Sequence, residues 1–425
     1  MLSHTRPAAL AIVAALACVV PLAAQTQQDS LAERVRRAEE ALEQLRARLE
    51  QQAQPTVRSR SRSTVELYGL IIANGYYNSA KTNNSDIPAY ADVVTAADSA
   101  SGLPMSNVGA TARQTRLGLT VSGARALGAV ITGRLETDFV GGQQPSGSGR
   151  TSPLLRIRIA SVRMDWAHVG LLVGQDWTLL APQTPSSYAG LGVPLFGYSG
   201  NLWFRSPQAR LTTETPGKVH LGIQAAALAP MQSLPQSPVS TQTQPDSADR
   251  SGRPTVEGRA YLAWGSGETA GEIGAAAHAG WLATSGDSLL ESRAFSLDGR
   301  IAFGPHLVVS GEAFSGQALG SFNGAVGQNL GRSGVPVRAE GGWVQVDIRP
   351  GSGWQLGGGY GIDDPKDEDL VVATGRGRNV TYAGHLIWRL SGGLLFGAEY
   401  KRIETLYNAG TFVANHINVY SGMTF

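Results

Sequence analysis

Six arginines carry the clearest chemistry in this sequence, because each lies in a segment where polar and apolar residues alternate. They are Arg116, Arg134, Arg156, Arg158, Arg210 and Arg259. A guanidinium group stays protonated and holds a carboxylate by two parallel hydrogen bonds. If these segments are neighbouring strands, the side chains converge on one surface and attract anions. Glu136 and Asp138 alternate in step with Arg134, so the pattern also fits a ladder of charges that neutralise one another.

Signals for catalysis and for bound metals are weak. The segment 265–270 has the glycine spacing of a dinucleotide fingerprint, but it joins two expected strands and no helix follows it. The histidines from His168 onward are scattered without the short spacing of metal-ligand pairs, and no serine-hydrolase or zinc-protease motif is present. We therefore expect no enzyme activity, no catalytic residue, no metal and no cofactor.

Composition narrows the class of protein. Charged residues make up 16% of the 425 residues, whereas about 25% is usual in soluble domains. Glycine accounts for 53 residues, and one cysteine excludes a disulfide scaffold. Beyond the N-terminal region no apolar run approaches the roughly 20 residues of a membrane-spanning helix. A net charge of +2 gives no case for a nucleic-acid partner. Low charge and abundant glycine suit a transmembrane β-barrel.

Sixteen segments alternate with period two, which predicts β-strands. Their connections alternate between long loops, such as 78–112 and 180–204, and short turns, such as 215–217 and 304–305. This layout is typical of bacterial outer-membrane barrels. We predict an all-β fold, a sixteen-stranded antiparallel transmembrane barrel over 64–425. The segments are 64–77, 113–124, 129–140, 154–166, 169–179, 205–214, 218–228, 255–265, 270–282, 290–303, 306–316, 336–348, 354–363, 378–390, 394–405 and 411–425.

The alternation assigns a face to each side chain. In 154–163, Leu155, Ile157 and Ile159 oppose Arg156 and Arg158. A charge on the lipid face costs about 2–4 kcal/mol at mid-bilayer, so the charged face is expected to line the lumen. Aromatic residues near the strand ends predict two interfacial girdles: Tyr68, Trp166, Trp264, Trp354 and Trp388 at the turn end, and Trp177, Trp203 and Trp281 at the loop end.

Loop 180–204 is the expected constriction. It is long, follows the fifth predicted strand and contains no charged residue, so it is not an acidic loop of the kind that selects cations. A sixteen-stranded barrel encloses a water-filled channel, which such a loop would narrow. Its candidate constricting residues are Tyr188, Leu195, Phe196 and Tyr198.

The first 63 residues differ from the rest. Residues 1–24 have the pattern of a secretory signal peptide, which includes Cys18. In 25–52 an unbroken heptad pattern predicts a periplasmic coiled coil, although a single amphipathic helix lying on the barrel or the membrane also fits. A basic linker, 53–63, would meet anionic lipid headgroups or stay solvated. The heptad positions are Leu31, Val35, Ala38, Leu42, Leu45 and Leu49.

Several short motifs in the first half of the chain match one known group of barrels. They are the heptads, VELYG (65–69), RLG (116–118), GRLETDF (133–139), LVGQDWT (172–178) and RSPQAR (205–210). These motifs resemble porins with an N-terminal coiled coil, in particular the DcaP-like trimeric porins linked to dicarboxylate uptake. The second half matches only as generic barrel strands. The resemblance implies a sixteen-stranded homotrimer that passes small anionic solutes.

Together these features predict an outer-membrane porin for passive diffusion of small hydrophilic, anionic, dicarboxylate-like solutes. A phosphate-selective porin is one alternative. A structural outer-membrane protein that tethers the envelope through its coiled coil is another. Expected partners are further copies of the chain, outer-membrane lipid, lipopolysaccharide and small anions. An acidic loop near the C-terminal third would either hold a divalent cation that bridges lipopolysaccharide or remain solvated: Asp363, Asp364, Asp367, Glu368 and Asp369.

Overall fold

The computed structural model describes residues 56–58, 63–142, 153–230, 245–286, 288–372 and 375–425. The signal peptide predicted over 1–24 and the coiled coil predicted over 25–52 lie outside the described residues. Most of the linker predicted over 53–63 also lies outside them. These three assignments therefore stay predictions.

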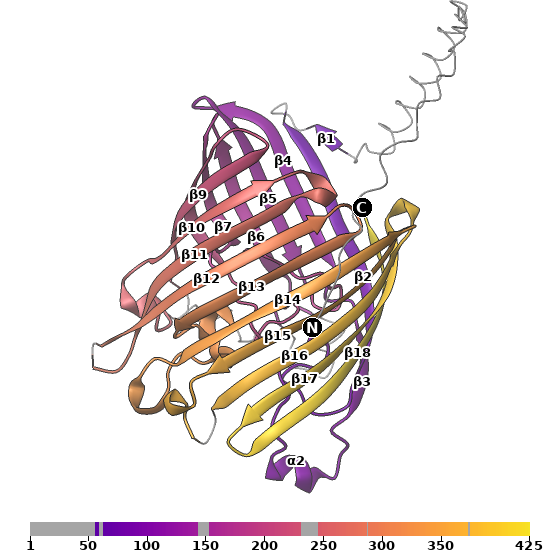
Figure 1. Ribbon diagram of the computed structural model, residues 1–425, viewed down its shortest axis with the longest axis vertical. Helices are drawn as coiled ribbons and strands as arrows, with labels where there is room; N and C mark the ends of the chain where they lie inside the picture. The colour runs from indigo at the N-terminus through magenta and orange to yellow at the C-terminus, as the bar shows by residue number, and fades with distance from the viewer. Residues whose placement is uncertain (1–55, 59–62, 143–152, 231–244, 287, 373–374) are drawn as a thin grey trace, which may run out of the picture. The chain divides into compact units, whose positions relative to one another are not determined.

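The described chain forms one antiparallel sheet that closes into a barrel, because the last strand pairs with the first long one (Figure 1). The strands are β1 (Thr56–Arg58), β2 (Thr64–Asn78), β3 (Asn107–Thr111), β4 (Arg116–Ala126), β5 (Ala129–Asp138), β6 (Arg156–Asp165), β7 (Val169–Trp177), β8 (Arg205–Glu214), β9 (Val219–Leu228), β10 (Thr255–Trp264), β11 (Gly271–Ala283), β12 (Leu289–Phe303), β13 (Leu307–Gln317), β14 (Arg338–Gly351), β15 (Trp354–Pro365), β16 (Arg376–Arg389), β17 (Leu394–Tyr407) and β18 (Gly410–Thr424).

The eighteen described strands fill sixteen positions in the wall. β3 and β4 pair with successive parts of β2 and together make one wall strand. β1 adds only three residues beside the start of β2. Each of the sixteen predicted segments corresponds to a wall strand, with every bound within three residues except that β3 extends the second wall strand back to Asn107. The predicted sixteen-stranded antiparallel barrel is confirmed.

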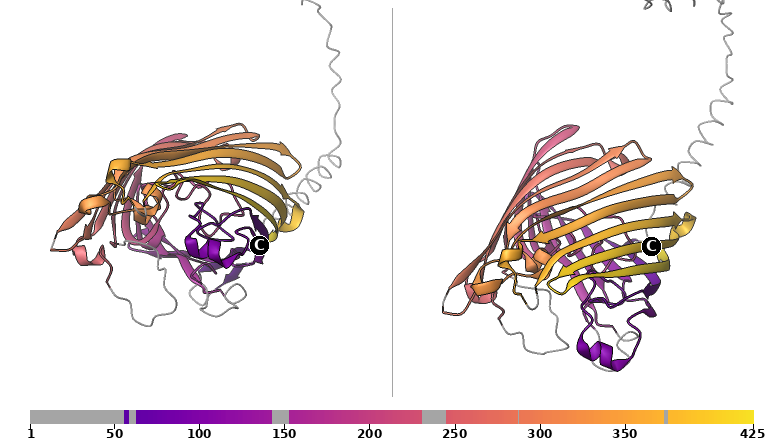
Figure 2. Two further views of the ribbon diagram at one scale, coloured as in Figure 1. Left: turned by 90° about the horizontal axis from the view of Figure 1, so that it is seen from below. Right: turned by 60° about the horizontal axis from the view of Figure 1, so that its bottom comes forward.

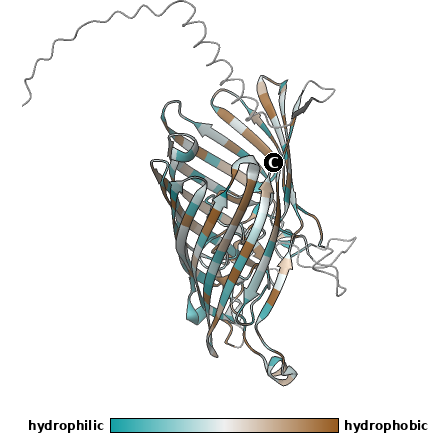
Figure 3. Cartoon of the chain, turned by 90° about the vertical axis from the view of Figure 1, so that its right-hand side faces the viewer, coloured by the Kyte–Doolittle hydropathy of each residue, from teal (hydrophilic) through white to brown (hydrophobic). Residues whose placement is uncertain are grey.

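The strands alternate in hydropathy along their length (Figure 3). Large apolar side chains are exposed on the outside of the barrel. Outward-facing Ile157, Ile223 and Val419 are each 53% exposed. On the opposite face, Asp298 and Gln345 are buried. This alternation is what a sheet between lipid and an enclosed interior requires.

One predicted facing is wrong. Ile159 was expected on the outer face with Ile157, but it is 2% exposed. The β5–β6 register shifts here: Glu136 lies opposite Ile159, and Thr137 lies opposite Ile157. Arg158 is the extra residue of this β-bulge. An inserted residue reverses the facing beyond it, which a count of every second residue does not detect.

Two of the aromatic residues expected in the girdles lie inside instead. The Tyr68 hydroxyl donates to Glu136 at 3.4 Å and accepts from Arg134, so this ring faces the lumen. Trp203 is buried at 2% exposure in the loop that follows β7. At the turn end, Trp354 and Trp388 do stack, with ring centroids 5.1 Å apart.

The loop between β2 and β3 contains the one described α-helix, α2 (Ala96–Ser101). The Thr95 side chain caps its N-terminus, and Asp98 closes the capping box. Hydrogen bonds from Lys81 and Thr95 hold the pKa of the Asp98 carboxyl well below its usual range. No helix in the described part of the chain is both long and apolar enough to cross a membrane. Short 3₁₀ turns complete the loops: η1 (Asp249–Ser251), η2 (Gly267–Thr269), η3 (Gly320–Phe322), η4 (Ala325–Gly327), η5 (Arg332–Gly334), η6 (Asp367–Asp369) and η7 (Ser391–Gly393).

The two faces of β9 give a direct test of the barrel's orientation. Ile223→Arg places a charge on the outer face, whereas the neighbouring Gln224→Arg places it on the inner face beside Thr212. We expect Ile223→Arg to lower the free energy of unfolding in lipid vesicles by about 2–4 kcal/mol. Gln224→Arg should change it by under about 1 kcal/mol, because that side chain meets water. Denaturant titration of the folded protein in vesicles measures both, and equal losses would contradict the assignment.

Candidate functional site

The loop between β7 and β8, residues 178–204, lies across the inside of the barrel. Its backbone and side chains bond to wall residues on many strands, including Gln114 before β4, Glu312 on β13, Gln345 on β14 and Glu399 on β17. These strands are spaced around the closed wall, so only a segment within the lumen reaches all of them. Figure 2 shows inner segments of chain between the curved strands. We call residues 178–204 the constriction loop.

Wall carboxylates hold one part of this loop by its N–H groups. Glu399 accepts hydrogen bonds from the Tyr188 amide at 2.6 Å, the Ala189 amide at 3.1 Å and the Ser187 hydroxyl at 2.5 Å. Glu312 accepts from the Gln183 amide at 2.7 Å. Hydrogen bonds to ionised groups are stronger than neutral ones. A loop without charges of its own is therefore fixed by ionisable side chains of the wall.

Arginines on the opposite part of the wall hold the loop by its carbonyl groups. Arg116 donates to the Leu191 oxygen at 2.6 Å, and Arg158 donates to the same oxygen at 3.2 Å. Arg156 donates to the Gly192 oxygen at 2.9 Å. Three of the six predicted arginines thus converge on two adjacent peptide groups of the constriction loop.

Apolar contacts also hold the constriction loop in place. Phe196 stacks on Trp343 with ring centroids 5.8 Å apart. It covers Gly359 and Gly361, where an added Cβ would lie 2.7 and 2.8 Å from its ring. Phe196 adopts a left-handed backbone conformation (φ 65°), which costs a non-glycine residue free energy that this packing offsets.

The four predicted constricting residues have different positions. Leu195 and Phe196 are buried against Trp343. Tyr188 packs with Leu191 on an apolar cluster of β2, β16, β17 and β18. Tyr198 alone of the four lines a cavity of about 930 Å³ beside the constriction loop. The other three therefore anchor the constriction loop and do not face this cavity.

Three of the six predicted arginines are neutralised by carboxylates. Arg156 forms a bidentate pair with Asp138 at 2.6 and 2.9 Å. Arg158 bonds Glu136 at 2.6 Å and Asp138 at 2.9 Å. Arg259 lies on β10, away from these two, and forms salt bridges with Asp298 and Glu272.

The charges of the other three arginines are compensated little or not at all by carboxylates. Among the described residues, no carboxylate lies within salt-bridge distance of Arg116 or Arg134. Arg134 is exposed to the lumen and donates to the Tyr68 hydroxyl. Arg210 has only a long contact, 3.7 Å, with Asp176. The wall of β4–β8 is thus a partly neutralised ladder with an excess of positive charge.

The groups that hold the loop were not predicted from the sequence. Glu257, Glu312 and Glu399 each accept a backbone N–H of the constriction loop, and Gln114 accepts two. Alternation places such residues on the inner face, but it does not show which peptide groups meet them. Arg205, the first residue of β8, was also missed. It lines the large cavity beside Arg156.

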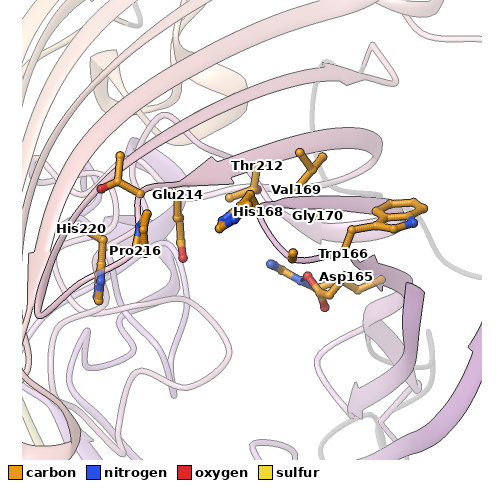
Figure 4. Close-up of a pocket in the computed structure, with 12 residues that line it drawn as sticks. Asp165, Trp166, His168, Val169, Gly170, Thr212, Glu214, Pro216 and His220 are labelled. Atoms are coloured by element: carbon orange, nitrogen blue, oxygen red, sulfur yellow. Dashed lines mark hydrogen bonds and ion pairs between the residues drawn. The ribbon is translucent and has the colours of Figure 1, made fainter. Parts of the chain in front are cut away.

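The acidic loop and a second pocket carry little chemistry. Asp363 is buried and accepts the Val326 amide, and Asp369 pairs with Arg338 at 2.7 Å, so both hold neighbouring loops together. The described residues contain no group of three or more side chains suited to a metal ion. A pocket of about 290 Å³ near the β6–β7 turn contains His168 and His220 (Figure 4). There Arg163 is paired with Asp165.

A closed sixteen-stranded barrel with a loop folded across its lumen defines the porin fold. The outer membrane channel DcaP of Acinetobacter baumannii superposes with a TM-score of 0.67 at 17% identity, over 87% of this chain and 99% of that one. An anion-selective porin from Comamonas acidovorans gives 0.54 at 15% identity, over 85% of this chain and 100% of that one. Salmonella typhi OmpF in complex with daunomycin gives 0.52 at 11% identity, over 87% and 100%.

These likenesses confirm the expected resemblance to DcaP-like porins at the level of the fold. A scan against protein-family models and a search of curated proteins both give no match.

Removal of Glu399 should loosen the constriction loop. Glu399→Ala deletes three hydrogen bonds to residues 187–189, each worth about 1.5–3 kcal/mol because the acceptor is charged. We expect larger current fluctuations in single-channel recordings than with the unaltered protein. Glu340→Ala is the matched control, since the Glu340 side chain is 61% exposed and holds no part of the loop. Equal fluctuations in the two variants would show that the loop is held by other means.

Proposed function

We propose that the protein is an outer-membrane porin through which small hydrophilic anions diffuse. The observation that carries this proposal is the wall of β4–β8, where arginines outnumber their carboxylate partners beside the constriction loop. Fixed positive charge in a narrow, water-filled passage favours anions over cations. The porin fold supports the channel part of the proposal, and the arginines support its anion preference.

The solute class is proposed on the chemistry of the same groups. A guanidinium fork matches the two oxygens of a carboxylate, so dicarboxylate-like solutes suit a wall with several separated arginines. A phosphate-selective porin remains the alternative, because the same groups bind phosphate oxygens. A purely structural role as an envelope tether would require a blocked lumen, and the cavity of about 930 Å³ beside the constriction loop supports the channel instead.

We further propose roles for the first 63 residues and an oligomeric state for the chain. Residues 1–24 would direct export and be removed. Residues 25–52 would form a coiled coil in the periplasm and residues 53–63 a basic linker. The heptad pattern supports self-association, and a homotrimer is the state that the resemblance implies. Lipid and lipopolysaccharide would surround the barrel.

Planar-bilayer recording tests the proposal. The full chain should insert with stepwise increases in conductance, and in a potassium chloride gradient its reversal potential should shift toward the chloride potential. Folded protein that gives no steps would refute the channel, and a shift toward the potassium potential would refute the anion preference.

Arg134→Gln should weaken that preference. The Arg134 side chain is exposed to the lumen and has no carboxylate within salt-bridge distance among the described residues, so its loss removes uncompensated charge. We expect the anion-to-cation permeability ratio to fall roughly twofold. Arg332→Gln, which alters an exposed loop residue outside the strands, is the control and should leave the ratio unchanged. Equal ratios in all three proteins would contradict the role of the arginine wall.

A further inference from the structure

Arg205 is a buried cation without a counter-charge. It begins β8, and its side chain lies between two indole rings, 4.9 Å from the centroid of Trp177 and 5.5 Å from that of Trp203. The residue is 3% exposed. Within the described chain it forms no salt bridge, and its Nη1 atom has no hydrogen-bond partner. A guanidinium group does not lose its proton to escape such a position.

The charges around Arg205 do not compensate it. The charged groups that act on it electrostatically include Arg158, Arg156, Asp138 and Arg116. Asp138 and Glu136 are already bound by Arg156 and Arg158. With Arg205, this cluster has four guanidinium groups against two carboxylates, an excess of two positive charges. Stacking on two indoles offsets part of the cost of burial, but an unpaired buried charge remains unfavourable.

A local change in the wall makes room for this side chain. The β6–β7 ladder ends at Ala160 and Gln175. Beyond it the Gln175 side chain donates to the backbone oxygens of Ile157 and Arg158, in place of strand pairing. The two strands therefore separate toward the loop end. Trp177 and Arg205, which pair with each other on β7 and β8, lie beyond the end of this ladder.

The cavity of about 930 Å³ lies at this position. Arg205, Arg156 and Trp203 line it, together with Tyr198 of the constriction loop and Asn329 of the β13–β14 loop. The Trp203 Nε1 atom, like Arg205 Nη1, is buried without a hydrogen-bond partner among the described residues. The side chains that carry these two unpartnered N–H groups both line this one cavity, whose volume is in the usual range for small-molecule sites.

We infer that this cavity is a binding station for an oxyanion, with Arg205 as its charged donor and Trp203 Nε1 as its second donor. The inference rests on the proposed anion channel and adds a stationary site within it. A bound carboxylate or phosphate would supply both the missing counter-charge and the missing acceptors. Arg156 would contribute less, because Asp138 occupies its fork. Passage through such a site is saturable, whereas diffusion through an unstructured pore is not.

The test is block of chloride current by a second anion. With the full chain in a planar bilayer, succinate and inorganic phosphate are added separately at rising concentration. We expect saturable block by at least one of them, and the one that blocks at lower concentration identifies the source of the oxyanion. Arg205→Gln should raise the blocking concentration at least tenfold. Arg205→Lys keeps the positive charge and should raise the blocking concentration less. Arg332→Gln, in an exposed loop, is the control.

The outcomes separate this inference from the proposed function. No conductance from folded wild-type protein would refute the channel alone. The binding site is then measured by tryptophan fluorescence in detergent, since Trp177 and Trp203 flank Arg205. Titration with succinate and phosphate should change the emission of the wild type and not of Arg205→Gln, with folding of both checked by circular dichroism. Block or fluorescence change that is equal in wild type and Arg205→Gln, or absent in the wild type, would overturn the oxyanion site.

Discussion

The structure of the lumen depends on how an uncharged loop is held by a charged wall. Peptide groups buried inside a barrel need partners, and here the wall supplies ionisable side chains. Carboxylates such as Glu399 and Glu312 take the N–H groups of the constriction loop, and arginines of β4 and β6 take its carbonyl groups. Because these bonds come from both sides, the loop cannot move toward either wall without the loss of charge-assisted hydrogen bonds.

The same bonds explain the electrical asymmetry of the interior. On the side of β10–β17 most buried carboxylates are occupied by the loop or by their own partners, as Asp298 is by Arg259. On the side of β4–β8 some arginines are paired with Glu136 and Asp138, but Arg116, Arg134 and Arg205 have no carboxylate within salt-bridge distance in the described chain. Anchoring of the loop and attraction of anions are therefore two consequences of one charge distribution.

Periodicity alone was enough to predict the barrel and not the details of its interior. Sixteen strands follow from alternation, because a sheet between lipid and an enclosed interior leaves that pattern on every strand. Ile159 was misplaced because a bulge adds one residue that no composition rule marks. β3 was not predicted, because its five residues lie within a long loop and are recognised only by pairing with β2.

The site was predicted by residue type but not by pairing. Arg116, Arg156 and Arg158 do converge on the constriction loop, yet Arg259 lies among acidic residues elsewhere in the wall. The loop was recognised from its length and lack of charge, while Tyr188, Leu195 and Phe196 anchor it in place of facing the cavity. Contacts between strands distant in sequence decide such roles, and the order of residues along one strand does not contain them.

The central claim is that the constriction loop lies in the path of the current. Val193, in the middle of this loop, lines the large cavity, and the only native cysteine, Cys18, lies in the predicted signal peptide. A negatively charged, membrane-impermeant thiol reagent applied to Val193→Cys during bilayer recording tests the claim most directly. We expect a stepwise, lasting fall in anion current that the unaltered protein does not show. Complete labelling of Val193→Cys with no change in current would contradict it.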